Sequence, residues 1–301
     1  MKKPNHFGTK NIYTLLHELT VRNSDNGAYF TDTRRLDRIA NELKESPFVY
    51  YRKAPLYHAY AQVPFEELPE KILVISSHVD FKRSTFDCFS DESDLDFLVG
   101  TYDNAITNAS IVTLMKKYPL PKNLVVVFTG DEEEDQGGAD EFCTYLNKEL
   151  RRKAKCIVLD VTESGNKEGA IFTIENDCWN EKWGRRILTW ARDKEICWKY
   201  VPYKKSRLKK SLIQELVDKD HCIENVADID ETSIYYEAND IKCFSFCIPV
   251  ELMDPEGRYA PWGEGMHSSA GLRVRKDAYE KYIQALKEVI WVTYNRPEDI
   301  E

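Results

Sequence analysis

The chain has 301 residues, of which 42% are hydrophobic, and this length and composition can supply a large buried core. The formal net charge of −9 argues against a nucleic-acid-binding surface, because such a surface needs clustered lysine and arginine. The polar N-terminus has no apolar core of signal-peptide length, and no segment reaches the roughly 18 apolar residues of a membrane span.

The eight cysteines are scattered along the chain without a CxxC pair, and some stand in apolar runs such as "KCFSFCIP". Free thiols in such surroundings behave as small hydrophobes. A disulfide framework is not expected in a chain of this size. We therefore predict a cytoplasmic protein with reduced cysteines that binds neither membranes nor nucleic acid.

The first part of the chain predicts two helices followed by three strands. Apolar residues recur at helical spacing in residues 10–22 and 33–45. Strand-like apolar runs follow at 47–52, 58–63 and 71–77.

Strands and helices alternate in the remainder of the chain. The expected strands are 123–129, 155–161 and 242–248, and the expected helices are 104–118, 138–152, 181–195 and 276–293. Such alternation is typical of an α/β protein with a mostly parallel, mixed central sheet flanked by helices. We expect one catalytic domain over residues 1–301, with elaborations near 81–100, 200–230 and 250–266.

The segment "LVVVFTGDEEEDQGGAD" at 124–140 joins an apolar strand to five consecutive acids, Asp131 to Asp135. Each of these carboxylates raises the free energy of ionising its neighbours. A solvated loop is the ordinary explanation of an acidic run. The position directly after a buried strand indicates instead that cations neutralise this one.

Acidic and histidine side chains also follow other predicted strands or begin a predicted helix. In parallel α/β sheets, ligands bind at the carboxyl ends of the strands, so these side chains are expected to meet. The residues at these positions are His78, Asp80, Asp103, Glu132, Glu133, Asp160 and His267.

Imidazole and carboxylate ligands without thiolates suit Zn²⁺ or a similar ion held for catalysis. Two such ions about 3.5–4 Å apart can clamp an attacking hydroxide and a developing oxyanion together. A neighbouring carboxylate that binds no metal can then move the proton from the water to the leaving amine. The pattern therefore predicts a hydrolytic metal site.

Five short motifs occur in an order that resembles the co-catalytic (di-zinc) metallo-exopeptidase superfamily. They are "HVD" (78–80), "GTYDN" (100–104), "DEEEDQGGA" (131–139), "LDVT" (159–162) and "MHS" (266–268). The chain is similar to the single-domain zinc aminopeptidases of the bacterial leucyl aminopeptidase and glutamyl aminopeptidase type. This resemblance implies the zinc-exopeptidase (phosphorylase/hydrolase-like) fold and two Zn²⁺, with Co²⁺ or Mn²⁺ as alternative metals.

The resemblance also implies which residues bind the metals. His78 and Asp160 would hold one ion, Glu133 and His267 would hold the other, and Asp103 would bridge them. Members of this superfamily often have a cis peptide after the bridging aspartate.

Two further roles follow from the same resemblance. Glu132 would be the general base and acid for hydrolysis of an N-terminal peptide bond by hydroxide bound to the ions. Asp80 would accept the second imidazole N–H of His78 and so fix its tautomer.

The register of the acidic run decides which glutamates take these roles. Family members typically read Glu-Glu-x-Gly-x-x-Gly, and choosing Glu132 and Glu133 places Gly138 at the last glycine. This choice leaves Asp135 where the first glycine belongs, which is a departure from the family. The long segment before His267 is a second departure, and its glycines and aromatic residues predict a loop over the site at 250–266.

Several functions stay open from the sequence. A carboxypeptidase or an amide deacylase could use the same metals, and Arg258, Arg273 and Arg275 flank His267, where a carboxypeptidase needs cations. A single-zinc glutaminyl-cyclase-like acyltransferase would not need five ligands, and a non-catalytic binding protein would be expected to lose some of them. The expected substrate is a peptide or amide, and a homo-oligomer stays open.

Overall fold

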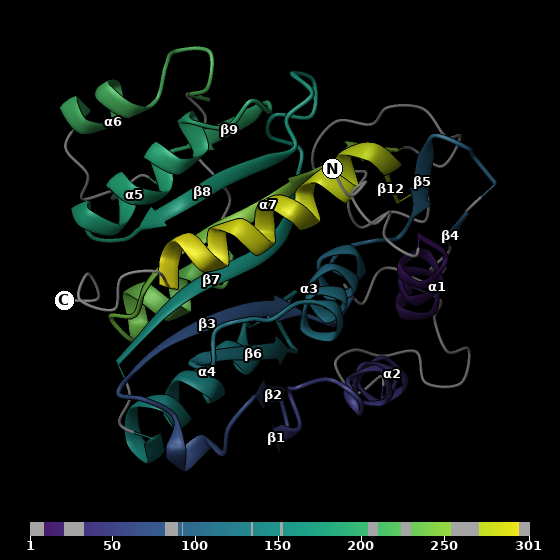
Figure 1. Cartoon of the computed structure of the whole chain (residues 1–301), viewed down its shortest axis with the longest axis vertical. Coiled ribbons are helices and arrows are strands. Elements are labelled where there is room, and N and C mark those ends of the chain that lie inside the picture. The colour runs from purple at the N-terminus through teal and green to yellow at the C-terminus, as the bar shows by residue number, and fades with distance from the viewer. Residues whose placement is uncertain are drawn as a thin grey trace, which may run out of the picture.

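The computed structural model contains a large central sheet, a smaller second sheet and helices on both faces of the large one (Figure 1). It describes residues 9–20, 33–81, 90–91, 93–133, 135–150, 153–203, 210–223, 230–253 and 271–294. His267, Arg258 and most of the predicted loop over the site lie outside these residues.

The central sheet has eight strands, and its central strands are parallel. In spatial order the strands are β1 (Tyr50–Lys53), β2 (Tyr57–Ala61), β6 (Leu124–Thr129), β3 (Lys71–His78), β7 (Lys153–Thr162), β10 (Lys242–Pro249), β8 (Phe172–Cys178) and β9 (Trp198–Val201). The parallel pairs are β3–β6, β3–β7, β7–β10 and β8–β9, whereas β1–β2, β2–β6 and β10–β8 are antiparallel. The prediction of a mixed, mostly parallel sheet is confirmed.

The central strands are apolar on both faces because helices cover both. On β3, Leu73 and Ile75 belong to one core cluster, whereas Ile72 and Val74 belong to the other. The first cluster includes residues of α1 (Thr9–Thr20), α2 (Thr33–Leu43), α3 (Ala105–Lys117), α5 (Glu181–Arg192), α6 (Lys210–Leu216) and α7 (Lys276–Tyr294). The second includes residues of η1 (Phe65–Glu67), α4 (Gly137–Thr144) and the π-helices η2 (Tyr145–Leu150) and η3 (Ser233–Ala238).

Helix α3 is buried from Ala105 to Met115, including its polar residues. These polar side chains hold the end of β3. The amide of Asn108 donates to the carbonyl of His78 at 2.7 Å, and the hydroxyls of Thr107 and Ser77 lie 2.8 Å apart. The helix therefore fixes the strand end that carries the first predicted ligand.

The second sheet brings together two of the predicted elaborations. Its antiparallel strands are β11 (Glu251–Leu252), β12 (Leu272–Arg275), β5 (Phe97–Gly100) and β4 (Ser90–Asp91). Gly271, with φ of 69°, lies so close to β5 that a Cβ there would stand 2.3 Å from the carbonyl oxygen of Gly100. The elaboration near 200–230 contributes α6, and its segments 204–209 and 224–229 lie outside the described residues.

Most predicted elements are found within a few residues of their expected bounds. The strand expected at 47–52 begins only at Tyr50, and the helix expected at 138–152 becomes a π-helix after Thr144. Strands β8 and β9 were not predicted, because Glu175, Asn176 and Asp177 interrupt the apolar run of β8.

The seven cysteines in the described ranges form no disulfide with one another. Among the helices that the structure describes, none combines the length and hydropathy that crossing a bilayer requires.

Candidate metal centre

His78 is the last residue of β3, and its side chain is only 3% exposed. Its Nε2 atom lies 3.1 Å from Oδ1 of Asp103, 3.7 Å from Oδ1 of Asp160 and 3.9 Å from Oε2 of Glu132. Three carboxylates from three separate segments therefore converge on one imidazole nitrogen.

The register of the parallel strands explains this convergence. His78 pairs with Thr129 of β6, and Ser76 pairs with Val158 of β7. Because side chains two apart in a strand share a face, His78 and Asp160 project from neighbouring strands on one face and at one level. The turn after β6 begins at the same edge of the sheet.

Asp103 reaches the site from the loop that precedes α3. The peptide bond between Asp103 and Asn104 is cis, as the resemblance predicted. The side-chain amide of Asn104 donates to the carbonyl of Leu159 at 2.6 Å, next to Asp160. This hydrogen bond connects the start of α3 to β7 and places the two aspartates on facing segments.

The acidic run forms a tight turn between β6 and α4. Asp131 and Gln136 both have positive φ values, 63° and 56°, so the chain reverses over these residues. The backbone N–H of Glu133 donates to Oδ2 of Asp80 at 3.1 Å. Asp135, which departs from the family pattern, is exposed to solvent.

Gly138 closes this turn against β2. A Cβ at this position would stand 2.4 Å from the carbonyl oxygen of Leu56 and 2.5 Å from that of Gly130. Only glycine allows this approach of three backbone segments. The requirement supports the register in which Glu132 and Glu133 form the functional pair.

Asp80 lies behind the imidazole and is 2% exposed. Its Oδ1 atom is 3.4 Å from Nδ1 of His78, and neither atom has a hydrogen-bond partner elsewhere in the described part of the chain. An Nδ1–H donated to Asp80 would leave Nε2 of His78 unprotonated and directed at the other carboxylates.

The site residues form two groups that could each hold an ion. One comprises His78, Glu132 and Glu133, and the other comprises His78, Asp103 and Asp160; within each group the ligand atoms lie within 4.8 Å of one another. Both groups offer imidazole nitrogen and carboxylate oxygen. This ligand chemistry fits zinc held for catalysis and related first-row ions.

Burial and mutual repulsion raise the free energy of ionising the carboxylates of this cluster together. Burial, together with the charge of Asp103, raises the pKa of Glu133 to about 9. Burial likewise raises the pKa of Asp160 to about 6 and that of Glu132 well above its ordinary value. Divalent cations between these groups would remove the repulsion, so the electrostatics of the site also fit bound metal.

The carboxylates around His78 raise the pKa of its imidazole. Burial disfavours the charged form of His78, but the neighbouring carboxylates of Glu132, Asp103, Asp160 and Asp80 outweigh burial and raise its pKa well above the ordinary value. For Asp80, burial is outweighed by the adjacent imidazole of His78, which lowers its pKa.

Sequence reasoning missed one buried carboxylate, that of Glu231. It accepts a hydrogen bond from the hydroxyl of Ser76, two residues before His78 and therefore on the same face of β3. The Tyr235 hydroxyl donates to Ser76 at 3.0 Å, and burial raises the pKa of Glu231 to about 7. The only signal in the sequence was an acidic pair directly before the apolar turn "TSIYY".

The arginines considered for a carboxypeptidase do not pair with the site carboxylates in the described residues. Arg273 forms an ion pair with Glu251, and Arg275 forms one with Asp277. Both stand on β12, in the second sheet.

The sequence of the chain matches one known protein family. The model of peptidase family M28 matches residues 60–231, which include six of the seven predicted site residues. Among curated protein sequences, none matches the chain significantly.

Solved structures share the fold at low sequence identity. PhTET1-12s, a dodecamer in its asymmetric unit, is 9% identical with a TM-score of 0.60, over 92% of this chain and 98% of that one. The LapA aminopeptidase of Legionella pneumophila is 12% identical with a TM-score of 0.54, over 94% and 70%. A dinuclear metal binding peptidase of the M20 family from Bacillus subtilis is 10% identical with a TM-score of 0.53, over 95% and 98%.

Proposed function

Because the chain belongs to peptidase family M28 and is a metallo-exopeptidase, we propose that it binds two zinc ions at the end of β3 and removes N-terminal residues from peptides. The observation that carries this proposal is the convergence of three carboxylates on Nε2 of His78, at 3.1 to 3.9 Å.

The proposed ligands divide between two positions. His78 and Asp160 would hold one ion, Glu133 and His267 the other, and Asp103 would bridge them. When bound, the ions would lower the pKa of a water molecule and offset the negative charge that develops on the substrate carbonyl oxygen.

Glu132 is proposed to carry the proton. Its carboxylate is partly buried, and it lies farther from Nε2 of His78 than the carboxylates of Asp103 and Asp160 do. It would take a proton from the attacking water and deliver it to the amine nitrogen as the C–N bond breaks. Asp80 would act through His78, by holding the imidazole in the tautomer that presents Nε2.

A carboxypeptidase remains the second candidate, because Arg273 and Arg275 line a cavity together with Pro249, which pairs with Thr162, two residues beyond Asp160. A carboxypeptidase would hold the terminal carboxylate of its substrate within one residue of the scissile bond. An aminopeptidase would instead tolerate any chain length beyond that bond.

The experiment is a comparison of three substrate classes with the zinc-loaded, full-length protein. We expect hydrolysis of leucine p-nitroanilide, with weaker or no hydrolysis of an N-blocked peptide with a free carboxyl terminus or of N-acetyl-leucine. Elemental analysis after desalting should give two equivalents of zinc. One equivalent, or hydrolysis of only the blocked substrates, would contradict the proposal.

Cellular location and assembly remain proposals. The cysteines of the described ranges, which form no disulfide with one another, support a reducing compartment such as the cytoplasm. A closed assembly of identical chains is proposed from the dodecamer of PhTET1-12s, and analytical ultracentrifugation would test it.

A further inference from the structure

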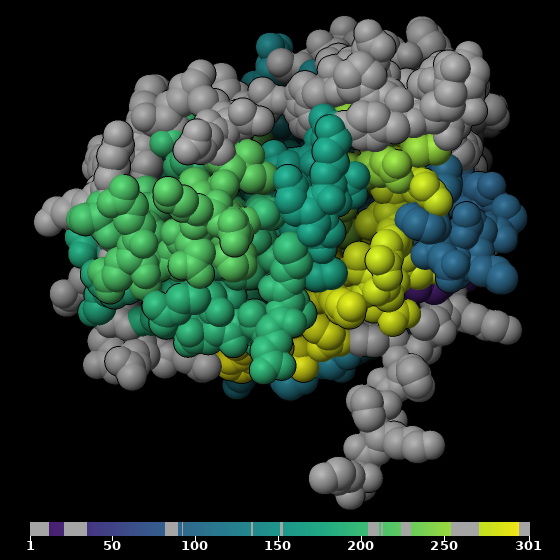
Figure 2. All heavy atoms as spheres, turned by 90° about the horizontal axis from the view of Figure 1, so that it is seen from above, coloured from purple at the N-terminus to yellow at the C-terminus, as the bar shows by residue number. Residues whose placement is uncertain are grey.

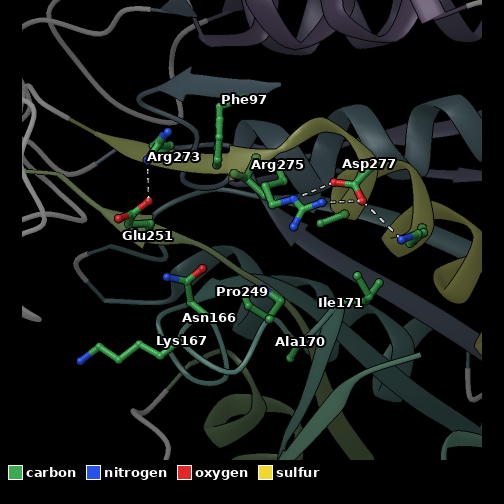
Figure 3. A pocket seen from close by; sticks show the side chains of 14 residues that line it. Phe97, Asn166, Lys167, Ala170, Ile171, Pro249, Glu251, Arg273, Arg275 and Asp277 are labelled. Atoms are coloured by element: carbon green, nitrogen blue, oxygen red, sulfur yellow. Dashed lines mark hydrogen bonds and ion pairs between the residues drawn. The ribbon is translucent and has the colours of Figure 1, made fainter. Parts of the chain in front are cut away.

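A cavity of about 520 Å³ lies between β12, the start of α7 and the loop that leads into β8. Figure 2 shows it as a hollow between the teal and the yellow segments, and Figure 3 shows its lining. Pro249 in its wall is two residues beyond Cys247, which pairs with Asp160 across β10 and β7. The wall therefore begins about 7 Å along the strand direction from the level of Asp160.

The cavity is positively charged, although the chain as a whole has a net charge of −9. Its lining includes two acids, Glu251 and Asp277, and four cations, so that its formal charge is 4 − 2 = +2. The cations are Lys167, Arg273, Arg275 and Lys281. A concave surface of one sign concentrates ligands of the opposite sign.

Three of these cations pair with a lining acid, and Nζ of Lys281 lies 3.3 Å from Oδ2 of Asp277. The Nε and Nη2 atoms of Arg275 donate to Asp277 at 2.9 and 3.0 Å, which leaves three of the five guanidinium N–H groups for another partner. In Figure 3 this guanidinium stands beside the open space between β12 and the loop that carries Ala170. The guanidinium of Arg273 lies 3.5 Å from the ring centre of Phe97 and pairs with Glu251 at 3.2 Å.

The remaining lining is largely apolar and includes Ile171, Pro249 and Ala278. Apolar walls with oriented arginines suit a peptide segment that carries one carboxylate, because a guanidinium fork matches carboxylate geometry. Guanidinium groups match phosphate as well as carboxylate, so the apolar lining, which a peptide can cover and a phosphate group cannot, decides between the two. The cavity chemistry therefore favours an acidic peptide over a phosphorylated ligand.

We propose that this cavity is a remote subsite that binds a carboxylate of the peptide substrate, several residues beyond the bond that is cleaved. This inference rests on the proposed peptidase function. An extended peptide advances about 3.3 Å per residue, so the offset of about 7 Å along the strands alone takes up about two residues of the substrate. The carboxylate could be the carboxyl terminus of a short peptide or an acidic side chain.

A length series of substrates tests this assignment. Peptides of leucine followed by one to five alanines are compared as free acids and as carboxyl-terminal amides. We expect KM of the free acid to fall about fivefold to tenfold below that of the amide at one or two adjacent lengths only, since a charge-assisted contact at a partly exposed site is modest. A second series, amidated and with one glutamate moved along the alanines, identifies a side-chain carboxylate as the source.

Variants connect the effect to the cavity. In Arg275→Gln, and separately in Lys281→Gln, the ratio of the two KM values should approach one. Arg185→Gln is the matched control, because Arg185 is a half-exposed arginine on α5 that pairs with Glu181 and Glu215 away from the cavity. It should keep the full ratio.

Equal KM values for acid and amide at every length, and no preference for glutamate at any position, would overturn the subsite. Failure of the peptidase proposal is detected separately, by zinc content and by leucine p-nitroanilide, which is too short to reach the cavity. If no substrate is hydrolysed, calorimetric titration of the same peptides into the full chain decides the cavity assignment. Tighter binding of the acids that is lost in Arg275→Gln supports it, and equal binding overturns it.

Discussion

Glu132 and Glu133 are adjacent in the sequence, yet the proposed chemistry gives them different roles, as the proton carrier and as a metal ligand. Both side chains are partly buried and carry raised pKa values, so burial alone does not distinguish a ligand from a proton carrier. Substitution by glutamine separates the two roles, because it keeps the shape of the side chain and removes its charge and basicity.

We expect Glu132→Gln to keep two equivalents of zinc and to lose about 10²–10⁴-fold in kcat, the usual contribution of a general acid–base group. Glu133→Gln should instead lose zinc, because it removes a charged ligand. Zinc content and the hydrolysis rate of leucine p-nitroanilide are measured on both variants. Exchanged phenotypes would contradict the assigned register.

Asp80 is expected to act only through His78. In Asp80→Asn the acceptor of the imidazole N–H loses its negative charge, and zinc affinity should fall about 10–100-fold, which is typical for the partner of a metal-binding histidine. Competition with a chelating dye measures this affinity. The control is Asp193→Asn, an exposed aspartate at the end of α5. An unchanged affinity in Asp80→Asn would mean that His78 is oriented by other contacts.

At the scale of elements, the turn between β6 and α4 positions both glutamates. Gly138 fixes it, since this glycine packs against the backbone of Leu56, which directly precedes β2, and of Gly130, where the turn begins. The glycine therefore belongs to the site although it contacts no proposed ligand.

Gly138→Ala should destabilise the protein by about 1–3 kcal/mol, the usual penalty for forcing a methyl group into a packed position. It should also reduce zinc content, because the turn must move. Gly169→Ala is the matched comparison: this glycine has a φ of 71° but open space around it, so the cost should be only about 1 kcal/mol with full zinc content. Urea denaturation measures the first effect and elemental analysis the second. Equal behaviour of the two variants would contradict this role of the turn.

At the scale of the whole molecule, the site makes stability depend on pH and on metal together. The folded state raises the pKa of Glu133 to about 9 and that of Asp160 to about 6, above their ordinary values of 4.5 and 3.8. Groups with a raised pKa in the folded state stabilise it fully below the unfolded pKa, and this contribution is lost as pH rises through the folded pKa. The metal-free protein should therefore lose stability from about pH 4 to pH 9.

Zinc should reverse this loss, because the ions supply the positive charge that protons supply at low pH. We expect the zinc-induced increase in Tm to be small near pH 5.5 and about 5–10 °C near pH 8.5, the size given by strong binding to a chain of this length. Differential scanning calorimetry with zinc or with a chelator measures it. An increase that is larger at pH 5.5 would contradict the carboxylate cluster as the binding site.

Much of this fold could be predicted from local pattern. Strands β3, β6 and β7 contain the uninterrupted apolar runs "ILVI", "LVVVF" and "CIVL", so their burial on both faces is visible in the sequence. Strand β8 was missed because Glu175 and Asp177 are buried there, and only the neighbouring strands β10 and β9 provide its pairing. The second sheet joins segments more than 150 residues apart, and no local pattern shows such pairing.

The sequence by itself determined which residue types end each central strand, and therefore that a metal-binding peptidase site of histidine and carboxylates was to be expected. The tertiary structure alone decided how these residues meet, because strand register sets which side chains share a level and a face. It also revealed Glu231 beneath His78 and the cationic cavity beside β12. Glu231 and the cavity both depend on contacts between segments that are distant in the sequence, and such contacts produce no periodic pattern in a single sequence.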